Sequence, residues 1–308
     1  MAGCALCKVR EAEIRLDYAR MGLCVDCFIK FYERKVGGTI KKFRMFPSDG
    51  RVAVAVSGGK DSGALLHVLR TLYPDLELTA IHLNLGIEGY SKECEDAVRK
   101  LAVSLDVDLK VFHLEEEGFT IQKLAETNHR RRICSLCGLV KRYWLNRIAY
   151  DLGVETLATG HTLDDLAKTA LNHYIHGDVE SLLKLKPVLP SNLEKKLVGR
   201  VKPLCEVTGF ENSAYVNYVG VPYTPLRCRF SRRGGEDRKE VIVQNILKVM
   251  PSFRHVFFKS HLKRFIPILE KGCEIESDLK ECCICGMPTS RDVCAYCALK
   301  DSLERKKD

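Results

Sequence analysis

Residues 51–69 read RVAVAVSGGKDSGALLHVL and join three patterns. Val52, Val54 and Val56 alternate with small alanines, which is typical of a strand buried on both faces of a parallel sheet. A glycine-rich turn follows, and leucines at helical spacing come after it. This order predicts an anion site, because the free N–H groups and the dipole of a helix N-terminus point into the turn. A tight strand-to-helix turn without a ligand is the alternative.

The alternation of strand and helix patterns continues along the chain. We expect strands in 77–86, 109–114 and 156–160, and helices in 91–105, 120–127, after Cys137 and from Leu163. This alternation predicts an α/β fold with a doubly wound parallel sheet, whose ligands lie at the carboxyl ends of the strands. From about residue 226 the pattern becomes helical.

Composition and charge narrow the class of protein. Of the 308 residues, 46% are hydrophobic and 29% are charged, which is typical of a globular protein. No run approaches a membrane span and the first residues do not resemble a secretory signal, so we expect a cytosolic protein with no membrane partner. The net charge of +9 and basic runs at 129–132, 227–233 and 259–264 favour a partner with a phosphate backbone, although charged runs are usually solvated faces. Abundant Lys, Arg and Glu with little Gln indicate a thermophile.

Eight of the fifteen cysteines form two quartets of paired CxxC units. The quartets are Cys4, Cys7, Cys24 and Cys27, and Cys282, Cys285, Cys294 and Cys297. This spacing predicts two structural zinc sites with four thiolates each, one near each end of the chain. Disulfides are the alternative, since hyperthermophiles use them inside the cell. Cys283 could replace Cys282, but Cys282 keeps the two-residue gap.

A lone CxxC pair, Cys134 and Cys137, lies between the basic run at 129–132 and a helix that we expect to start near Cys137. Two thiolates need partners from elsewhere to hold a metal, or they form a redox pair. Cys228 is the leading partner, because Arg227 and Arg229 flank it and cations lower the pKa of a thiol. The remaining cysteines are expected to be buried and inert: Cys94, Cys205 and Cys273.

Four parts follow from these patterns. We expect an N-terminal zinc module in 1–45, a catalytic domain in 46–225, a helical extension with Cys228 in 226–272, and a C-terminal zinc module in 273–308.

A second strand-to-helix turn lies in TLATGHTLDDLAKTALNHYIHGD, residues 156–178. His161, Asp164 and Asp165 fall in the turn and the first helical positions. Thr162 and Asp165 have the spacing of a capping box, and acids favour a helix N-terminus in any case. Taken alone, this pattern therefore predicts helix capping.

The turn SGGKDS differs from the GxxxxGK[ST] loop of other nucleotide-binding proteins. It resembles the PP-loop of the ATP pyrophosphatases, which release pyrophosphate and leave AMP on the substrate. Together with ICSLCG, GHTLDD, the later lone cysteine and a quartet near each end, the chain resembles the tRNA 2-thiouridine synthetases of the TtcA/TtuA group, and its TtuA branch in particular.

The resemblance assigns roles to individual residues. It implies ATP-binding residues Ala55, Ser57, Gly58, Gly59, Lys60, Asp61, Ser62, His82, Lys141, Gly160 and Asp165, of which Lys141, Asp165 and Asp61 would be catalytic. It also implies that Cys134, Cys137 and Cys228 hold a 4Fe-4S cluster with one open iron. The role of Asp164 stays open.

By the same resemblance, ATP with Mg²⁺ would adenylate a uridine carbonyl oxygen of tRNA, and sulfur would then displace AMP. The T-loop ribothymidine at position 54 is the expected target, with sulfur from the C-terminal thiocarboxylate of a ubiquitin-like carrier protein or from another sulfide source. A homodimer is expected from the family alone. Three alternatives remain: the wobble uridine at position 34, a persulfide or disulfide relay without a cluster, and a zinc-containing RNA-binding protein without enzymatic activity.

Overall fold

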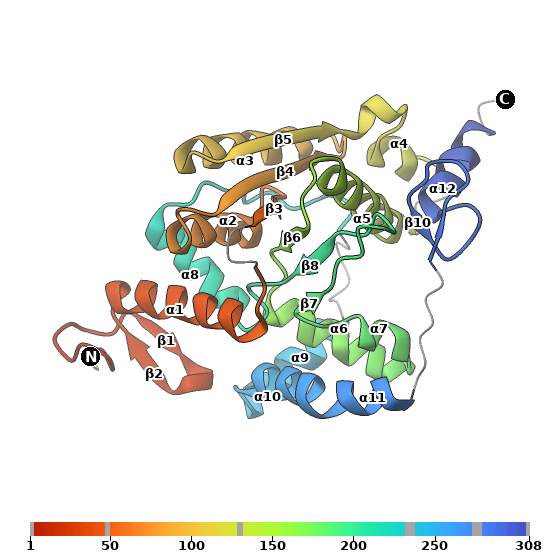
Figure 1. Ribbon diagram of the computed structural model, residues 1–308. Helices are drawn as coiled ribbons and strands as arrows, with labels where there is room; N and C mark the ends of the chain where they lie inside the picture. Colours follow the sequence, from red (N-terminus) through yellow and green to blue (C-terminus); the bar gives the residue numbers. More distant parts are fainter. Residues whose placement is uncertain (1–2, 47–49, 128–131, 232–237, 273–278, 306–308) are drawn as a thin grey trace.

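The computed structural model describes residues 3–46, 50–127, 132–231, 238–272 and 279–305. A six-stranded sheet with the strand order β5-β4-β3-β6-β8-β7 forms its centre (Figure 1). Its strands are β3 (Arg51–Ala55), β4 (Glu77–Asn84), β5 (Asp108–His113), β6 (Thr156–Thr159), β7 (Val188–Leu189) and β8 (Gly199–Val201). The predicted α/β architecture is confirmed.

The strand order places both turns singled out in the sequence at one point of the sheet. From β3 the chain adds β4 and β5 on one side and then crosses to β6 on the other side of β3. The carboxyl ends of β3 and β6 therefore lie next to each other where the order reverses, which is where open α/β sheets bind ligands.

One edge of the sheet departs from the expected parallel arrangement. β7 pairs antiparallel with β8, with Val188 opposite Val201 and Leu189 opposite Arg200. The short link between Leu189 and Gly199 folds back through a bridge between Asn192 and Leu197. A parallel pair needs a crossover of about a dozen residues or more, so this link permits only a hairpin.

Helices cover both faces of the sheet (Figure 1). Val52 and Val54 of β3 belong to the main core, together with buried leucines of α2, whereas Ala53 faces a second core with Ala149 of α5. These helices are α2 (Lys60–Leu72), α3 (Ser91–Leu105), α4 (Ile121–Ala125), α5 (Ile133–Asp151), α6 (Leu163–His176), α7 (Val179–Leu183) and α8 (Gly209–Val219). The predicted burial of β3 on both faces is thereby explained.

The N-terminal segment consists of β1 (Ile14–Leu16), the short turn η1 (Asp17–Ala19), β2 (Met21–Leu23) and the long helix α1 (Val25–Phe43). Helix α1 packs against α2 and α8. Tyr32, which is fully buried, stacks on Tyr215 of α8 with ring centroids 4.0 Å apart. The core of the central domain therefore continues into α1.

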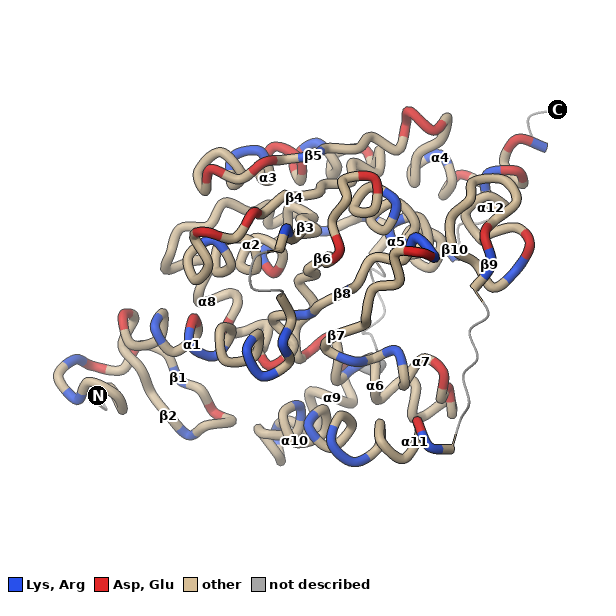
Figure 2. Tube along the Cα trace, in the orientation of Figure 1, with Lys and Arg blue, Asp and Glu red and all other residues tan. Residues whose placement is uncertain are grey.

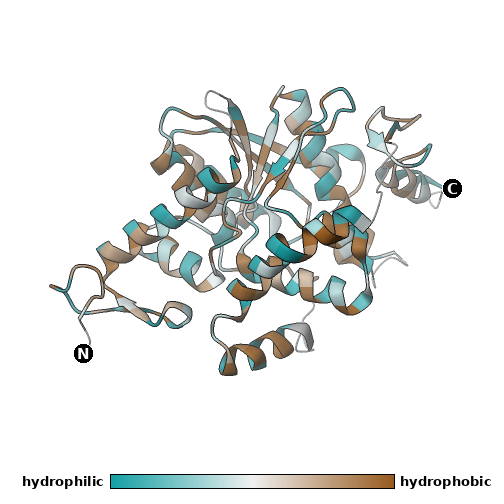
Figure 3. Ribbon diagram, turned by 60° about the horizontal axis from the view of Figure 1, so that its bottom comes forward, coloured by the Kyte–Doolittle hydropathy of each residue, from teal (hydrophilic) through white to brown (hydrophobic). Residues whose placement is uncertain are grey.

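The C-terminal segments form two further layers. The elements α9 (Arg238–Val249), α10 (Phe253–Ser260), η4 (His261–Phe265) and α11 (Ile266–Gly272) lie on the side of α6 and α7. Figure 3, turned to bring this side forward, shows hydrophobic and hydrophilic residues interspersed along its helices. A last segment with β9 (Lys280–Glu281), β10 (Pro288–Thr289) and α12 (Ala295–Glu304) rests on α5, where Tyr296 stacks on Tyr143 at 4.0 Å.

Helix α5 begins at Ile133, about one turn before the predicted start near Cys137. Cys134 and Cys137 therefore lie within the helix rather than ahead of it. No helix in the described ranges is long and apolar enough to cross a membrane. Of the expected features, Cys273, residues 129–131 and residues 232–233 of the basic runs lie outside the described part.

Candidate functional site

The turn after β3 is shaped by glycine. Gly58 has φ of +84°, and a Cβ there would lie 2.6 Å from Cα of Cys94 on α3, so no side chain fits. Gly59 is the N-cap of α2 and offers no side chain to bond the first N–H groups of that helix. The N–H of Ser57 donates to Ser62 Oγ at 3.0 Å, which closes the turn. An open helix N-terminus of this kind suits phosphate.

Two charged residues begin α2 and are held by α8. Lys60 Nζ lies 2.6 Å from Asp61 Oδ1 and 3.4 Å from the carbonyl oxygen of Gly209. Asn212 Nδ2 donates to the same Asp61 oxygen at 2.9 Å, and Asn212 Oδ1 accepts from the Tyr32 hydroxyl at 2.6 Å. The positions of Lys60 and Asp61 thus depend on α8 and, through Tyr32, on α1.

The turn after β6 packs directly on the first one. A Cβ on Gly160 would lie 3.0 Å from the backbone nitrogen of Ser62, so glycine allows the close approach. Thr162 and Asp165 form the predicted capping box, in which Asp165 Oδ2 accepts from the Thr162 N–H at 3.0 Å. Asp165 remains exposed at the edge of this turn. In contrast to α2, the N-terminus of α6 is occupied by its own side chains.

Asp164, whose role the sequence leaves open, joins three helices. Its Oδ2 accepts from the N–H of Gly209 at 2.7 Å, and its Oδ1 lies 2.8 Å from Arg254 of α10. Burial raises the pKa of the Asp164 carboxyl, while Arg254 acts in the opposite direction. The arrangement connects α10 to the backbone of Gly209, which contacts Lys60.

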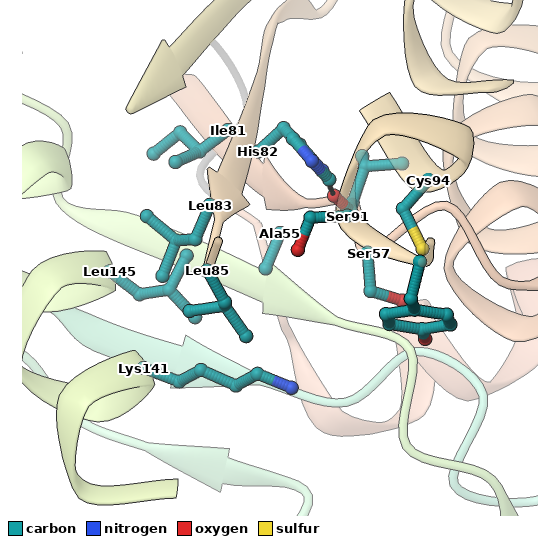
Figure 4. A pocket seen from close by; sticks show the side chains of 12 residues that line it. Ala55, Ser57, Ile81, His82, Leu83, Leu85, Ser91, Cys94, Lys141 and Leu145 are labelled. Carbon is teal, nitrogen blue, oxygen red and sulfur yellow. Dashed lines mark hydrogen bonds between the residues drawn. The ribbon is translucent and has the colours of Figure 1, made fainter. Parts of the chain in front are cut away.

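A pocket opens beside the first turn, between α3, α5 and the ends of β3 and β4. Ala55, Ser57, His82, Cys94 and Lys141 are among its lining residues. Figure 4 shows the Lys141 side chain extending along the pocket from α5. The small Ala55 side chain leaves room at the strand end. Tyr90 and Leu85 add apolar surface to the lining, so the pocket can hold a flat, largely apolar group.

His82 is almost completely buried at this pocket. Its Nδ1 lies 2.8 Å from the carbonyl oxygen of Val56, which can only accept, so Nδ1 carries the proton. Burial lowers the pKa of the imidazole, and the ring is therefore neutral near pH 7. Its contact with Val56 ties β4 to the start of the turn.

The three central cysteines lie in one region, although Cys228 is far away in sequence. Cys134 Sγ donates to the carbonyl oxygen of Phe230 at 3.2 Å, which joins α5 to the loop that carries Cys228. Burial raises the pKa of the Cys137 thiol; the nearby Lys141 acts in the opposite direction, and the nearby Cys228 and Cys134 raise it further. Three thiols from two segments form a donor set that fits an iron–sulfur cluster.

Each terminal quartet brings its four sulfur atoms within 4.8 Å of one another. The Sγ atoms of Cys7 and Cys24 are 3.9 Å apart, and those of Cys285 and Cys294 are 3.8 Å apart. Four thiolates about 2.3 Å from a tetrahedral zinc ion would be about 3.8 Å apart, whereas a disulfide bond measures about 2.05 Å. The described cysteines form no disulfide. Both quartets can therefore bind a metal ion.

The structure gathers the predicted residues into two adjacent groups. The first surrounds the two turns and the pocket and contains Ala55, Ser57, Gly58, Gly59, Lys60, Asp61, Ser62, His82, Lys141, Gly160 and Asp165. The second contains Cys134, Cys137 and Cys228. Cys205 and Cys94 are buried as expected, but Cys94 also lines the pocket.

Asn212, Gly209 and Arg254 were missed by sequence reasoning. Asn212 and Gly209 belong to α8, whose sequence carries only a helix-capping pattern, Thr208 with Glu211. Nothing in their own sequence marks contacts with residues about 150 positions away.

Comparison of the sequence with known protein families assigns the chain to one of them. A family model described as a PP-loop domain matches residues 32–224. The chain belongs to the PP-loop family. The PP-loop itself is the turn at 57–62, and the predicted resemblance is confirmed.

Similar proteins narrow the family further. The tRNA-5-methyluridine(54) 2-sulfurtransferase of Pyrococcus horikoshii is 38% identical, over 96% of this chain and 92% of that protein. Its namesake from Thermotoga maritima is 33% identical, over 97% and 96%. A solved structure of the U34-tRNA thiolase NcsA from Methanococcus maripaludis with its 4Fe-4S cluster has a TM-score of 0.81 at 29% identity, and the match covers 98% of this chain and 97% of that one.

Proposed function

We propose that the protein is an ATP-dependent tRNA 2-sulfurtransferase that acts on 5-methyluridine 54. The observation that carries the proposal is the face of α5. Cys134, Cys137 and Lys141 lie at positions i, i+3 and i+7 of that helix and so share one face. Helix α5 thereby connects the group of three cysteines with the nucleotide pocket. Two relatives, at 38% and 33% identity, are named for position 54; the wobble position named for NcsA is the alternative.

The first chemical step makes a good leaving group of the uridine C2 carbonyl oxygen. That oxygen attacks the α-phosphorus of ATP, an O–P bond forms, and the bond to pyrophosphate breaks. Lys60 and the open N–H groups of the PP-loop would hold the departing phosphates, and Lys141 would stabilise charge on the α-phosphate. Ala55 and His82 would border the nucleoside. Gly160 would lie beside it.

Asp61 lies in the first turn and Asp165 in the second. Carboxylates beside phosphates are typical ligands of Mg²⁺, so we assign them to the Mg²⁺ of bound ATP. Asp165 would bind Mg²⁺ from its exposed position at the start of α6, where it also takes part in the capping box. The capping and catalytic roles are compatible, because only Oδ2 serves the cap contacts with Thr162.

The second step exchanges oxygen for sulfur at C2, with AMP leaving. We assign Cys134, Cys137 and Cys228 as the ligands of a 4Fe-4S cluster. When bound, a cluster with three protein ligands offers one open iron for the incoming sulfide. We further propose that sulfur comes from a ubiquitin-like carrier with a C-terminal thiocarboxylate, or from another sulfide source.

Both quartets are assigned to structural zinc, on the sulfur distances and the buried position of several of the thiols. Metal analysis of the purified chain tests this, with about two zinc ions per chain expected and none expected if the thiols are only packing residues. We also propose the four-part division of the chain at residues 45, 225 and 272. The protein would act as a homodimer in the cytoplasm, where tRNA and ATP occur.

Mass mapping of modified tRNA tests the proposed substrate. Unmodified and 54-methylated tRNA would be incubated anaerobically with the iron-reconstituted protein, ATP and sulfide, then digested and sequenced by mass spectrometry. We expect the mass increase of an oxygen-to-sulfur exchange at position 54, and an approximately 100-fold lower rate with Lys141→Ala. Sulfur at position 34 would instead support the wobble alternative, and sulfur at neither position would contradict the proposal.

A further inference from the structure

A groove of about 450 Å³ runs between the C-terminal half of α1 and the α10–η4 segment. We call it the lysine groove. Lys35 and Lys42 line its α1 side, and Lys259 and Lys263 line the opposite side. Phe43 and Leu262 are among the apolar residues between them. Figure 2 shows Lys and Arg positions of α1 and α10 on this side of the molecule.

The two sides of the lysine groove differ in how their charges are balanced. Lys35 pairs with the buried Glu211 at 2.8 Å, and Lys42 pairs with Glu206. Lys259 and Lys263 are exposed, and within the described ranges neither takes part in an ion pair. The α10–η4 side therefore presents uncompensated positive charge.

The groove reaches the start of α6. Leu163, the first residue of α6, lines it, and the chain continues directly into Asp164 and Asp165. Gly160, three residues earlier, contacts the PP-loop. A ligand in the groove therefore contacts the helix whose first turn carries these two acids.

This combination fits a nucleic-acid strand better than an acidic protein segment. Cations along an edge contact phosphates, and an aromatic ring between them, here Phe43, offers a surface on which a base can stack. We propose that the lysine groove binds the phosphate backbone of the tRNA substrate and directs the target nucleotide toward the pocket. This inference rests on the proposed function.

The test compares two double variants of the full chain that each remove two charges. Lys259→Ala with Lys263→Ala changes the groove, and Lys100→Ala with Lys110→Ala changes exposed lysines of α3 and β5 on the far side of the sheet. Binding of unmodified tRNA would be measured by filter retention at several salt concentrations. The groove variant should bind about tenfold more weakly, with a salt slope smaller by about 1 to 2, because each lost phosphate contact removes about 0.9 from the slope. The control variant and ATP affinity should match the wild type.

Three outcomes would overturn the groove. Equal binding by the groove variant and the wild type would exclude it, and equal losses in both double variants would show only general charge attraction. The groove variant could also bind tRNA normally and lose thiolation only when a carrier protein supplies the sulfur. That result would assign the groove to the carrier protein. Failure of the proposed function can be distinguished from failure of the groove proposal. In that case the wild type would bind tRNA through the groove but would not thiolate it.

Discussion

Cys228 is far in sequence from the two cysteines with which it shares one region of the fold. It lies more than ninety residues from Cys134 and Cys137, and its own sequence setting offers only two flanking arginines. The loop that carries it meets α5 through the contact between Cys134 and the Phe230 carbonyl. Cys205, in contrast, is fully buried, and burial raises its pKa to about 12, so it remains an unreactive thiol.

Replacing Cys228 by alanine should abolish thiolation and impair the iron–sulfur cluster, because two thiolates cannot hold it alone. ATP binding and the metal at the two quartets should stay at wild-type levels, since they use other residues. Visible absorption after anaerobic reconstitution with iron and sulfide, together with a thiouridine assay, measures both effects. Cys205→Ala is the matched control and should retain thiolation. Near-normal thiolation by Cys228→Ala would remove this residue from the site.

At the scale of elements, helix ends and strand ends determine the site. The N-terminus of α2 is left open by Gly59, whereas that of α6 is filled by Thr162 and Asp165. This difference was foreseeable, because glycines and a capping box are visible in the sequence. The start of α5 and the β7–β8 hairpin were not, because the ends of helices and the pairing of short strands depend on tertiary contacts.

The link between α10 and α8 should influence turnover. Arg254→Gln removes the ion pair between Arg254 and Asp164, whose side chains are 16% and 27% exposed, respectively. Because Asp164 also holds the N–H of Gly209, the change loosens the Gly209 backbone that contacts Lys60. We expect kcat/KM for ATP to fall about tenfold and the free energy of unfolding to fall by about 1 to 3 kcal/mol. Arg254→Lys should restore most of the activity.

Removing the cation of a remote ion pair gives the control. Lys184→Gln breaks the exposed pair with Glu180 on α7 and should change neither activity nor stability appreciably. If Arg254→Gln lost stability while kcat/KM remained unchanged, the pair would be structural only.

Across the whole molecule, segments far apart in sequence complete one site. Helix α1 supports Asp61 through Tyr32 and Asn212, and the C-terminal segment packs on α5 through Tyr296 and Tyr143. The PP-loop and the two cysteine quartets could be recognised from the sequence, because their chemistry requires particular residues at fixed spacings. The sequence could not place α10 beside α1, since no local pattern encodes a contact between segments more than 200 residues apart.

The products of ATP cleavage test the central claim most directly. With tRNA and sulfide present, the reconstituted protein should convert ATP to AMP and pyrophosphate in step with thiouridine formation, because attack occurs at the α-phosphorus. Asp61→Ala should lose this turnover while its circular dichroism stays that of the wild type. Release of ADP and phosphate, or AMP formation that does not depend on tRNA, would contradict activation of the uridine oxygen by adenylation.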